Sequence, residues 1–516
     1  MASFMKHKRE LPLGGQDPAA NLFTSPRKRK QLLQVALVGA ILFMLAYVGG
    51  FLDRQDYPSA SNEDPASQPL THTYDWTKHH SKVYIPSATT LDTWISSAHN
   101  MSHFSLPKNN FIEMGSRART YMNLFNLLYT TSGIPRKNIA SQIGGLEKVA
   151  EVEQALHLLE KNIYPFIKDG GKWDSALELL QSYKGKGIVM ATGDWHFKFA
   201  RHCILSLRYI GSTLPIQVFY AGKGDLKPEY QAELLKIDGV TVHDLADYLD
   251  IKGPEVNGWA VKPFSMLAST FAEMIFIDAD ALFFQPPEVM FSFERYKRTG
   301  AIFFRDRTIG WGMTETLKFL NKFITEPSEY AKRHGRILGL KSLHEGESGV
   351  IVYDKRTSFH GLLTTCKMNS NPWREFMYKE IHGDKESYWF AQELLKLPYA
   401  WVPGGGGTVG YELIKDNKQY ICGGLYHPDE NYKPLWWNGG VTMNKYFEDE
   451  GKGMVNFTHW ATDRKFENLE WLWEEKNRPF CLRPPGRGDI GELTREEREL
   501  TKGFQAIWMK LHPSGK

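Results

Sequence analysis

The chain has 516 residues, of which 42% are hydrophobic and 24% are charged, a composition typical of globular proteins. It excludes collagen-like, coiled-coil and wholly disordered structures. Seven Lys and Arg against two Asp and Glu give residues 1–31 a charge of +5, so a net charge of +4 leaves −1 for the remainder. Because nucleic-acid binding needs a clustered positive field, this balance argues against a nucleic-acid partner for the body of the chain.

The segment that follows the basic tail is apolar throughout. Residues 32–52 carry no charge, and as a helix they would extend about 31 Å, enough to cross a hydrocarbon core of roughly 30 Å. Residues 27–30 before it are basic and acidic residues follow from Asp53 on, so the positive-inside rule places residues 1–31 in the cytosol. A cleaved signal peptide and a buried core helix are weaker alternatives. The apolar region of a signal peptide is shorter than this segment, and a core helix has a polar face. We therefore expect a single-pass type II anchor with a lumenal body.

The lumenal part divides by composition into four segments. Residues 53–110 are rich in Ser, Thr, Pro and Asn, which predicts a stem. Apolar residues recur at helical spacing in residues 111–186, which predicts a small helical region. Residues 187–480 have the pattern of an α/β catalytic domain, and residues 481–516 form a C-terminal tail.

The cysteines and two acceptor sequons bear on the compartment. The sequence has no C-x-x-C pair, which would indicate a zinc or redox site. In an oxidising lumen the cysteines could form up to two disulfides, and the sequence does not favour any connectivity. Buried free thiols are the alternative. Asn100 and Asn456 begin N-x-[ST] sequons, which are used only on exposed lumenal segments. The cysteines are Cys203, Cys366, Cys422 and Cys481.

From residue 187 short apolar runs alternate with helical stretches, the pattern of a Rossmann-like α/β domain. Ligands of such sheets bind at the carboxyl ends of strands, so Thr192 and Gly193 are candidate donor contacts, with an ordinary turn as the alternative. No G-x-G-x-x-G follows, which argues against a dinucleotide site. The runs predicted as strands are 187–192, 214–222 and 240–245, and the helices are 197–210 and 226–237.

The strand predicted at residues 274–277 ends in Asp278-Ala279-Asp280. Residues i and i+2 of an extended chain point to the same side, so the two carboxylates converge and repel unless a positive charge lies between them. Mg²⁺ and Mn²⁺ accept such oxygen ligands and share their shell with substrate phosphates. The pair is therefore a candidate metal and diphosphate site, and Lys262 is a candidate phosphate contact. The alternative is an ordinary strand terminus.

Three more polar residues adjoin predicted elements. Glu347 precedes the strand at 350–355, and Asp384 lies before the helix at 388–397. Acids favour helix N-termini, so a helix cap is the alternative for Asp384. His459 ends a late strand, where a neutral imidazole is a candidate third metal ligand and a packed core histidine is the alternative. Glycines 404–407 lack the G-K-[ST] ending of a phosphate loop and predict a surface turn.

Three of these segments, residues 262–291, 347–356 and 383–391, together resemble the fungal Golgi α-mannosyltransferases of glycosyltransferase family 71. The likeness extends over roughly residues 187–460 and includes the type II layout. It implies a GT-A type Rossmann-like mixed sheet flanked by helices, GDP-mannose as donor, and a mannose-rich glycan as acceptor. It also implies an α-1,3 linkage, retention of the α configuration and a Golgi membrane location.

The resemblance further implies roles for individual residues. Mn²⁺ (or Mg²⁺) would be held by Asp278 and Asp280, with His459 at a late-histidine position, and Asp384 and Glu347 would be catalytic. We therefore predict a metal-dependent retaining mannosyltransferase. A GT-A transferase that uses a UDP-sugar and a catalytically silent, membrane-anchored glycan-binding subunit are the alternatives, because the metal motif indicates a diphosphate and neither the base nor the hexose.

Overall fold

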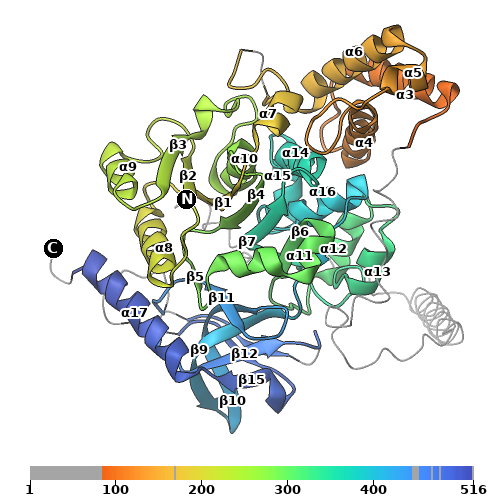
Figure 1. Cartoon of the computed structure of the whole chain (residues 1–516). Helices are drawn as coiled ribbons and strands as arrows, with labels where there is room; N and C mark the ends of the chain where they lie inside the picture. The colour runs from red at the N-terminus through yellow and green to blue at the C-terminus, as the bar shows by residue number, and fades with distance from the viewer. Residues whose placement is uncertain (1–83, 168–169, 444–452, 467–468, 476–477, 514–516) are drawn as a thin grey trace, which may run out of the picture. The chain divides into compact units, whose positions relative to one another are not determined.

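The computed structural model describes residues 84–167, 170–443, 453–466, 469–475 and 478–513, all within one compact unit of residues 63–516 (Figure 1). The predicted cytosolic tail, the anchor at 32–52 and the stem up to residue 83 lie outside these residues. Within them, no helix has both the length and the apolar character needed to cross a bilayer. The anchor therefore stays a prediction.

The helical region expected at residues 111–186 begins earlier than predicted. Helix α3 falls in the expected stem, where Ser87 caps it by accepting a hydrogen bond from the backbone N–H of Thr90. Leu91, Ile95 and Ala98 form one buried stripe on α3, which contacts α4 and α6. The helices are α3 (Ala88–Ser102), α4 (Phe111–Leu128), α5 (Ile139–Ile143), α6 (Leu146–Ile163) and α7 (Ala176–Ser182).

The central sheet has the order β3-β2-β1-β4-β7-β6-β8 (Figure 1). Strands β3, β2, β1 and β4 are parallel, whereas β7 is antiparallel to both β4 and β6. This arrangement confirms the predicted mixed α/β sheet. The strands are β1 (Lys186–Ala191), β2 (Ile216–Tyr220), β3 (Val240–Asp244), β4 (Glu273–Ile277), β6 (Ala301–Arg305), β7 (Gly346–Asp354) and β8 (Ala400–Trp401).

Helices connect the strands of this sheet. The two that the sequence predicted after 187–192 and 214–222 are present as α8 and α9. The helices are α8 (Phe197–Tyr209), α9 (Pro228–Leu235), η3 (Leu245–Asp247), η4 (Gly258–Ala260), α10 (Val261–Ala268), η5 (Pro287–Ser292), α11 (Glu294–Thr299), α12 (Met313–Leu320), α13 (Glu329–His334), α14 (Phe359–Met368), α15 (Trp373–Glu380) and α16 (Ser387–Leu395).

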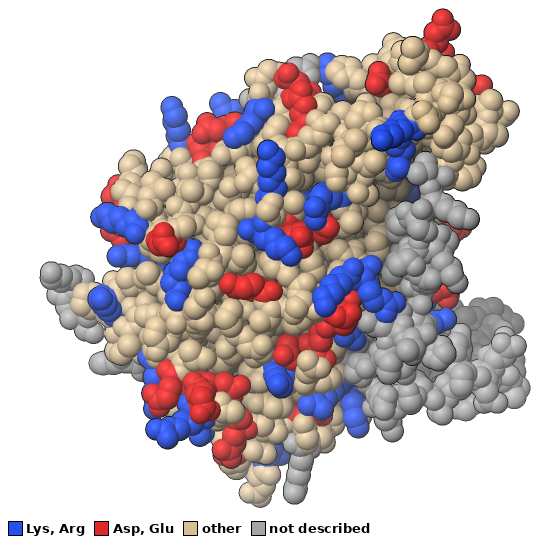
Figure 2. Space-filling view, viewed as in Figure 1, with Lys and Arg blue, Asp and Glu red and all other residues tan. Residues whose placement is uncertain are grey.

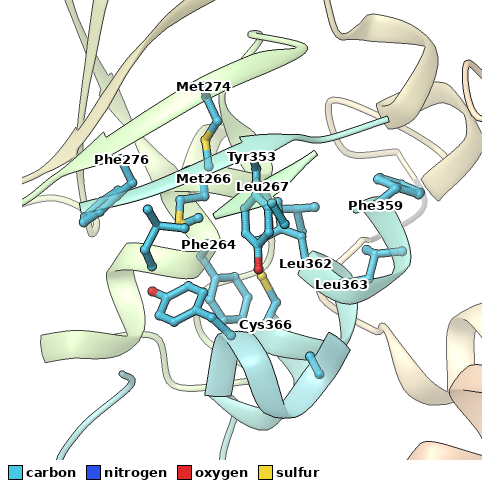
Figure 3. Packing of buried hydrophobic residues seen from close by; sticks show 14 of the residues in the cluster. Phe264, Met266, Leu267, Met274, Phe276, Tyr353, Phe359, Leu362, Leu363 and Cys366 are labelled. Carbon is cyan, nitrogen blue, oxygen red and sulfur yellow. The ribbon is translucent and has the colours of Figure 1, made fainter. Parts of the chain in front are cut away.

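Helix α10 is fixed in the core beside β1, β4 and α14. Phe264 and Leu267 pack in one buried cluster with side chains of β4, β7 and α14 (Figure 3). At the C-terminal end of α10, Nζ of the buried Lys355 donates hydrogen bonds to the carbonyls of Met266 (3.0 Å) and Ser269 (2.6 Å). A hydrogen-bond donor at this end satisfies helix carbonyls that have no partner within the helix. The helix therefore holds its N-terminal residues, which face the site, in a defined place.

A second sheet has the order β13-β14-β10-β9-β12-β15, and β11 joins it to β5. Strand β5 begins at Ala281, which pairs with Asn438 of β11. The second sheet is thereby attached to the end of β4, where the Asp278–Asp280 pair lies. Its strands are β5 (Ala281–Phe283), β9 (Gly405–Lys415), β10 (Lys418–Pro428), β11 (Pro434–Asn438), β12 (His459–Asp463), β13 (Glu470–Leu472), β14 (Cys481–Arg483) and β15 (Ile490–Glu492).

Two sequence expectations about this sheet are wrong. Glycines 404–407 are buried, and 405–407 belong to β9 instead of a surface turn. A Cβ at Gly407 would lie 2.0 Å from the carbonyl oxygen of Ala461, so the glycine allows β9 and β12 to approach. His459 begins β12 and does not end a strand.

Residues 481–516 are part of the same compact unit. Strand β14 pairs with β10, and a disulfide joins Cys422 to Cys481 across that pair. Cys203 and Cys366 are buried free thiols. The structure therefore contains both states of cysteine that the sequence left open.

The chain ends in helix α17 (Arg495–Leu511), which lies next to α8 (Figure 1). A capping box at Thr494 begins the helix. The ring of Trp508 stacks on Phe199 with centroids 5.3 Å apart, and Nε2 of His202 lies 2.8 Å from the carbonyl oxygen of Phe504. These contacts attach the C-terminus to the central sheet through α8.

Opening the disulfide is expected to destabilise the second sheet, because the bond closes a loop with a sequence separation of 59 residues. Loop-closure entropy for this length corresponds to about 4 kcal/mol. We expect a lower melting temperature in reductant and the same decrease in Cys422→Ala/Cys481→Ala without reductant. Reductant should not lower the melting temperature of the double variant further. An unchanged wild-type melting temperature in reductant would contradict the disulfide.

Candidate functional site

Charged side chains on the face shown in Figure 2 are interspersed and form no large field of one sign. Buried charges, in contrast, gather near the ends of β4, β6 and β7 and before α16. Burying a charge is unfavourable unless it is paired, so such a cluster is a candidate site. Its buried charged members include Asp280, Asp306, Glu345, Asp384, Lys385 and Glu386.

Asp278 and Asp280 follow β4 as predicted. The backbone N–H of Asp278 donates to the carbonyl of Gly349 (2.8 Å), and the backbone carbonyl of Asp280 accepts from the N–H groups of Gly439 (3.2 Å) and Gly440 (2.9 Å). The pair is therefore held between the central sheet and the turn after β11. Burial raises the pKa of Asp278 to about 6, and the charge of Asp280 adds to the rise.

Lys262, in the first turn of α10, pairs with the first of these carboxylates. Its Nζ lies 2.7 Å from Oδ2 of Asp278 and 3.3 Å from Oγ of Ser348. Burial alone would lower the pKa of Lys262, but the charges of Asp278 and Asp384 outweigh it and raise the pKa above its usual range. Lys262 is therefore a fixed positive charge beside the acidic pair.

Asp384 belongs to the same hydrogen-bonded group. Its Oδ1 accepts from Oγ of Ser348 (3.2 Å), and its Oδ2 accepts from the hydroxyl of Tyr388 (2.8 Å). Helix α16 begins at Ser387 with Glu386 as its N-cap residue. The helix-cap hypothesis for Asp384 is therefore wrong, because its carboxylate bonds to two side-chain hydroxyls instead.

Glu347 lies near the start of β7. Its Oε1 accepts from the backbone N–H of Gly349 (2.9 Å) and from Nδ2 of Asn438 (3.1 Å). Burial raises the pKa of Glu347 to about 7, with Asp306 adding to the rise and Lys385 opposing it. A carboxyl group with this pKa can hold or release a proton near neutral pH.

Asn438 is a site residue that the sequence analysis missed. A Cβ at Gly349 would lie 2.9 Å from Nδ2 of Asn438 and 3.1 Å from Cη2 of Trp436, so the glycine makes room for β11 beside Glu347. No local pattern in residues 434–438 indicates this contact. It depends on the pairing of β11 with β5.

A buried ion pair between Lys385 and Asp306 was also missed. Burial opposes ionisation of Asp306, but Lys385 and Arg307 outweigh it and hold the pKa of that carboxyl below its usual range. A signal was present, because Asp306 follows an apolar strand, β6, just as Asp278 follows β4. The neighbouring Arg336 guanidinium donates to the carbonyl of Asp306 (3.0 Å) and fixes this loop.

Thr192 and Gly193 lie at the same edge of the sheet. Val189 of β1 pairs with Phe276 of the parallel strand β4, which brings the end of β1 level with the start of the acidic pair. A Cβ at Gly193 would meet Oδ1 of Asp225 at 2.6 Å. The loop approaches Asp225 so closely that it explains a glycine at position 193. The role of Thr192 and Gly193 as donor contacts stays a prediction.

No contact that we find places His459 next to Asp278 or Asp280. It pairs with Gly410 and Glu492 in the second sheet, and its Nδ1 lies 2.9 Å from Oγ1 of Thr458. Among the described residues, no group of three or more His, Cys, Asp and Glu side chains is arranged to hold a metal ion. Its role as a metal ligand stays a prediction.

The sequon residues Asn100 and Asn456 lie in α3 and before β12, and both are exposed. An attached glycan needs such exposure. Their modification stays a prediction.

Residues 185–429 match a family model described as "Mannosyltransferase putative". "Putative alpha-1,3-mannosyltransferase MNN14" from Candida albicans is 30% identical over 344 residues, which cover 56% of this chain and 48% of that protein. "Probable alpha-1,3-mannosyltransferase MNT4" from Saccharomyces cerevisiae is 26% identical over 312 residues, 53% of this chain and 52% of that protein. The chain thus spans about half the length of the curated relatives that it matches.

"Alpha-1,3-mannosyltransferase MNN1" from Saccharomyces cerevisiae is 23% identical over 372 residues, 60% of this chain and 48% of that protein. Among solved structures, the galactosyltransferase LgtC aligns with a TM-score of 0.28 and 14% identity over 42% of this chain and 73% of that chain. The matched residues 185–429 contain the central sheet and the acidic cluster, and the resemblance expected from the sequence motifs is confirmed. Residues 185–429 thus match the model of this mannosyltransferase family, and the chain is a distant homologue of fungal α-1,3-mannosyltransferases.

Proposed function

We propose that the chain is a metal-dependent, retaining glycosyltransferase of GT-A type that transfers mannose from GDP-mannose to a mannose-containing glycan, forming an α-1,3 linkage. The observation that carries this proposal is the convergence of Asp278, Asp384 and Glu347 around Lys262 inside the region that matches the mannosyltransferase family. These four largely buried charged groups, two near strand ends and two near helix starts, have no evident structural need. Such groups suit a reaction in which a negatively charged leaving group separates from a positively charged sugar.

Location in the Golgi membrane, with residues 32–52 as the anchor and a lumenal body, is part of the proposal. The charge asymmetry around the anchor supports this orientation. The disulfide between Cys422 and Cys481 suits an oxidising lumen, as do the exposed sequons at Asn100 and Asn456.

The residues present fit a divalent cation that shares its shell with a substrate. Asp278 and Asp280 supply carboxylate oxygens at a buried strand end, and the charge of Asp280 adds to the raised pKa of Asp278. Two protein carboxylates leave positions for phosphate oxygens and water, which Mg²⁺ and Mn²⁺ prefer. When bound, the ion would supply positive charge to the leaving diphosphate.

The remaining charged groups have complementary roles. As the bond to the diphosphate breaks, the leaving group gains negative charge and the sugar gains positive charge. In this proposal the Lys262 ammonium, bonded to Asp278, stabilises the leaving group, and the carboxylates of Asp384 and Glu347 stabilise the sugar or attack it. Retention can follow a covalent route, in which a carboxylate attacks the anomeric carbon, or a front-face route, in which nearby carboxylates stabilise the positively charged sugar. A proton from the acceptor hydroxyl has to be removed, and Glu347 has a suitable pKa of about 7.

The test is turnover by the full chain in detergent, with a panel of GDP- and UDP-sugars, Mn²⁺ and mannoside acceptors. We expect transfer from GDP-mannose alone, with an α product. Preference for a UDP-sugar would favour the second transferase hypothesis. Nucleotide-sugar binding without transfer or hydrolysis would favour a silent glycan-binding subunit, a hypothesis to which the intact carboxylate cluster gives no support.

Replacing Asn438 by Leu is expected to shift the limb of the pH profile of kcat that reports Glu347 to higher pH. The amide donates to Oε1 of Glu347 at 3.1 Å and so favours its ionised form. Its removal should raise the pKa of Glu347 above about 7 and move that limb of the kcat profile upward by about one pH unit. Asn126→Leu, on the exposed surface of α4, is the control. An unchanged profile in Asn438→Leu would contradict this role.

A further inference from the structure

Three rings form a row beside the acidic cluster, which we call the ring strip: Trp259, His382 and His344. The ring centroids of Trp259 and His382 are 5.2 Å apart, and those of His382 and His344 are 6.4 Å apart. Trp259 is 40% exposed and His382 is exposed, whereas the side chain of His344 is only 12% exposed. The ring strip therefore runs from the surface into the site.

Elements of the site hold the outer end of the ring strip. Trp259 belongs to η4, directly before α10, which carries Lys262. A Cβ at Gly383 would lie 2.9 Å from Cε3 and 3.0 Å from Cδ2 of the indole, so one face of Trp259 covers the backbone immediately before Asp384. Gly383 has a φ of +70°, which also favours glycine. The position of the indole is thus coupled to that of the catalytic carboxylate.

The inner end of the ring strip approaches the buried charges. Nδ1 of His344 lies 3.8 Å from Oε1 of Glu386, is buried, and makes no hydrogen bond. Burial, followed by the charge of Lys385, lowers the pKa of both His344 and His382. Each neutral imidazole offers one donor and one acceptor. Such groups match hydroxyl groups better than phosphates.

We propose that the ring strip binds the acceptor, a neutral pyranoside, with the Trp259 indole against the apolar face of the sugar ring and the imidazoles on its hydroxyls. This inference rests on the proposed function. The diphosphate has a charged site at Lys262 and the acidic pair, whereas Lys385, the cation whose charge acts on both imidazoles, is already paired with Asp306. An acceptor that is the end of a larger glycan also needs a subsite open to solvent, which the exposed outer rings provide.

The experiment measures binding of methyl α-D-mannopyranoside to the full chain in detergent by saturation-transfer NMR, and acceptor and donor KM where transfer occurs. Trp259→Ala should raise the Kd and the acceptor KM at least about tenfold, and much more than the donor KM. Trp259→Phe keeps a ring and should retain most of the binding. His382→Ala, at an exposed position, should give a smaller rise. Trp473→Ala is the matched control, because Trp473 is 45% exposed and directly follows β13 of the second sheet.

The outcomes separate the ring strip from the proposed function. Loss of mannoside binding in Trp259→Ala, with binding kept in Trp473→Ala, supports the ring strip. This holds even if the chain turns over no nucleotide sugar, and that lack of turnover would count against the transferase. Equal Kd values in the wild type, Trp259→Ala and His382→Ala would overturn the ring strip and leave the transferase intact. A parallel rise in donor KM would also overturn it. If Trp259→Ala does not fold, His382→Ala decides, because an unchanged Kd in that variant would overturn the ring strip.

Discussion

Asp280→Asn is expected to reduce turnover by roughly a hundredfold to a thousandfold while the protein still folds. The amide keeps the shape of the side chain, and the hydrogen bonds that Gly439 and Gly440 donate involve only the backbone carbonyl of Asp280. What is lost is one negative charge from the proposed cation site. Melting temperature and transfer rate should be measured on the same preparation.

Chelation should mimic this substitution. Removal of divalent ions from the wild type should abolish transfer, and Mn²⁺ should restore it. Asp238→Asn is the matched control, because Asp238 is exposed between α9 and β3. A chelator-insensitive enzyme, or near-normal turnover by Asp280→Asn, would mean that the acidic pair is only a strand terminus.

Asp384→Asn and Glu347→Gln should each lower kcat at least about a hundredfold with little change in donor affinity. Both substitutions keep an oxygen that accepts hydrogen bonds, so Gly349 and Asn438 can still donate to residue 347. The charge that would stabilise or attack the anomeric carbon is removed. Kinetic constants and melting temperature together separate a catalytic effect from a loss of stability.

Tyr388→Phe is the control for Asp384, because it deletes the hydrogen bond to Oδ2 of Asp384 and leaves the charge in place. If Asp384 has only a structural role, Tyr388→Phe and Asp384→Asn should lower the melting temperature alike, by the equivalent of about 1 kcal/mol, and turnover should survive in both. A β-configured product from the wild type would contradict the retaining mechanism altogether.

Much of the fold and part of the site could be predicted from contiguous residues. The alternation of apolar runs and helical stretches predicted β1, α8, β2, α9 and β3, and the acid-terminated strand predicted β4 with Asp278 and Asp280. The sequence by itself also placed Glu347 and Asp384 beside elements that meet at the site. Strand and helix periods are properties of short segments, so a single sequence carries them.

Only the tertiary structure decided which distant residues meet. Lys385 bonds to Asp306 across 79 positions, and Asn438 bonds to Glu347 across 91. The same holds for Trp259 over Gly383 and for the burial of glycines 404–407 between paired strands. These contacts depend on which strands pair and in what register, and local periodicity leaves both open because the same pattern satisfies several pairings.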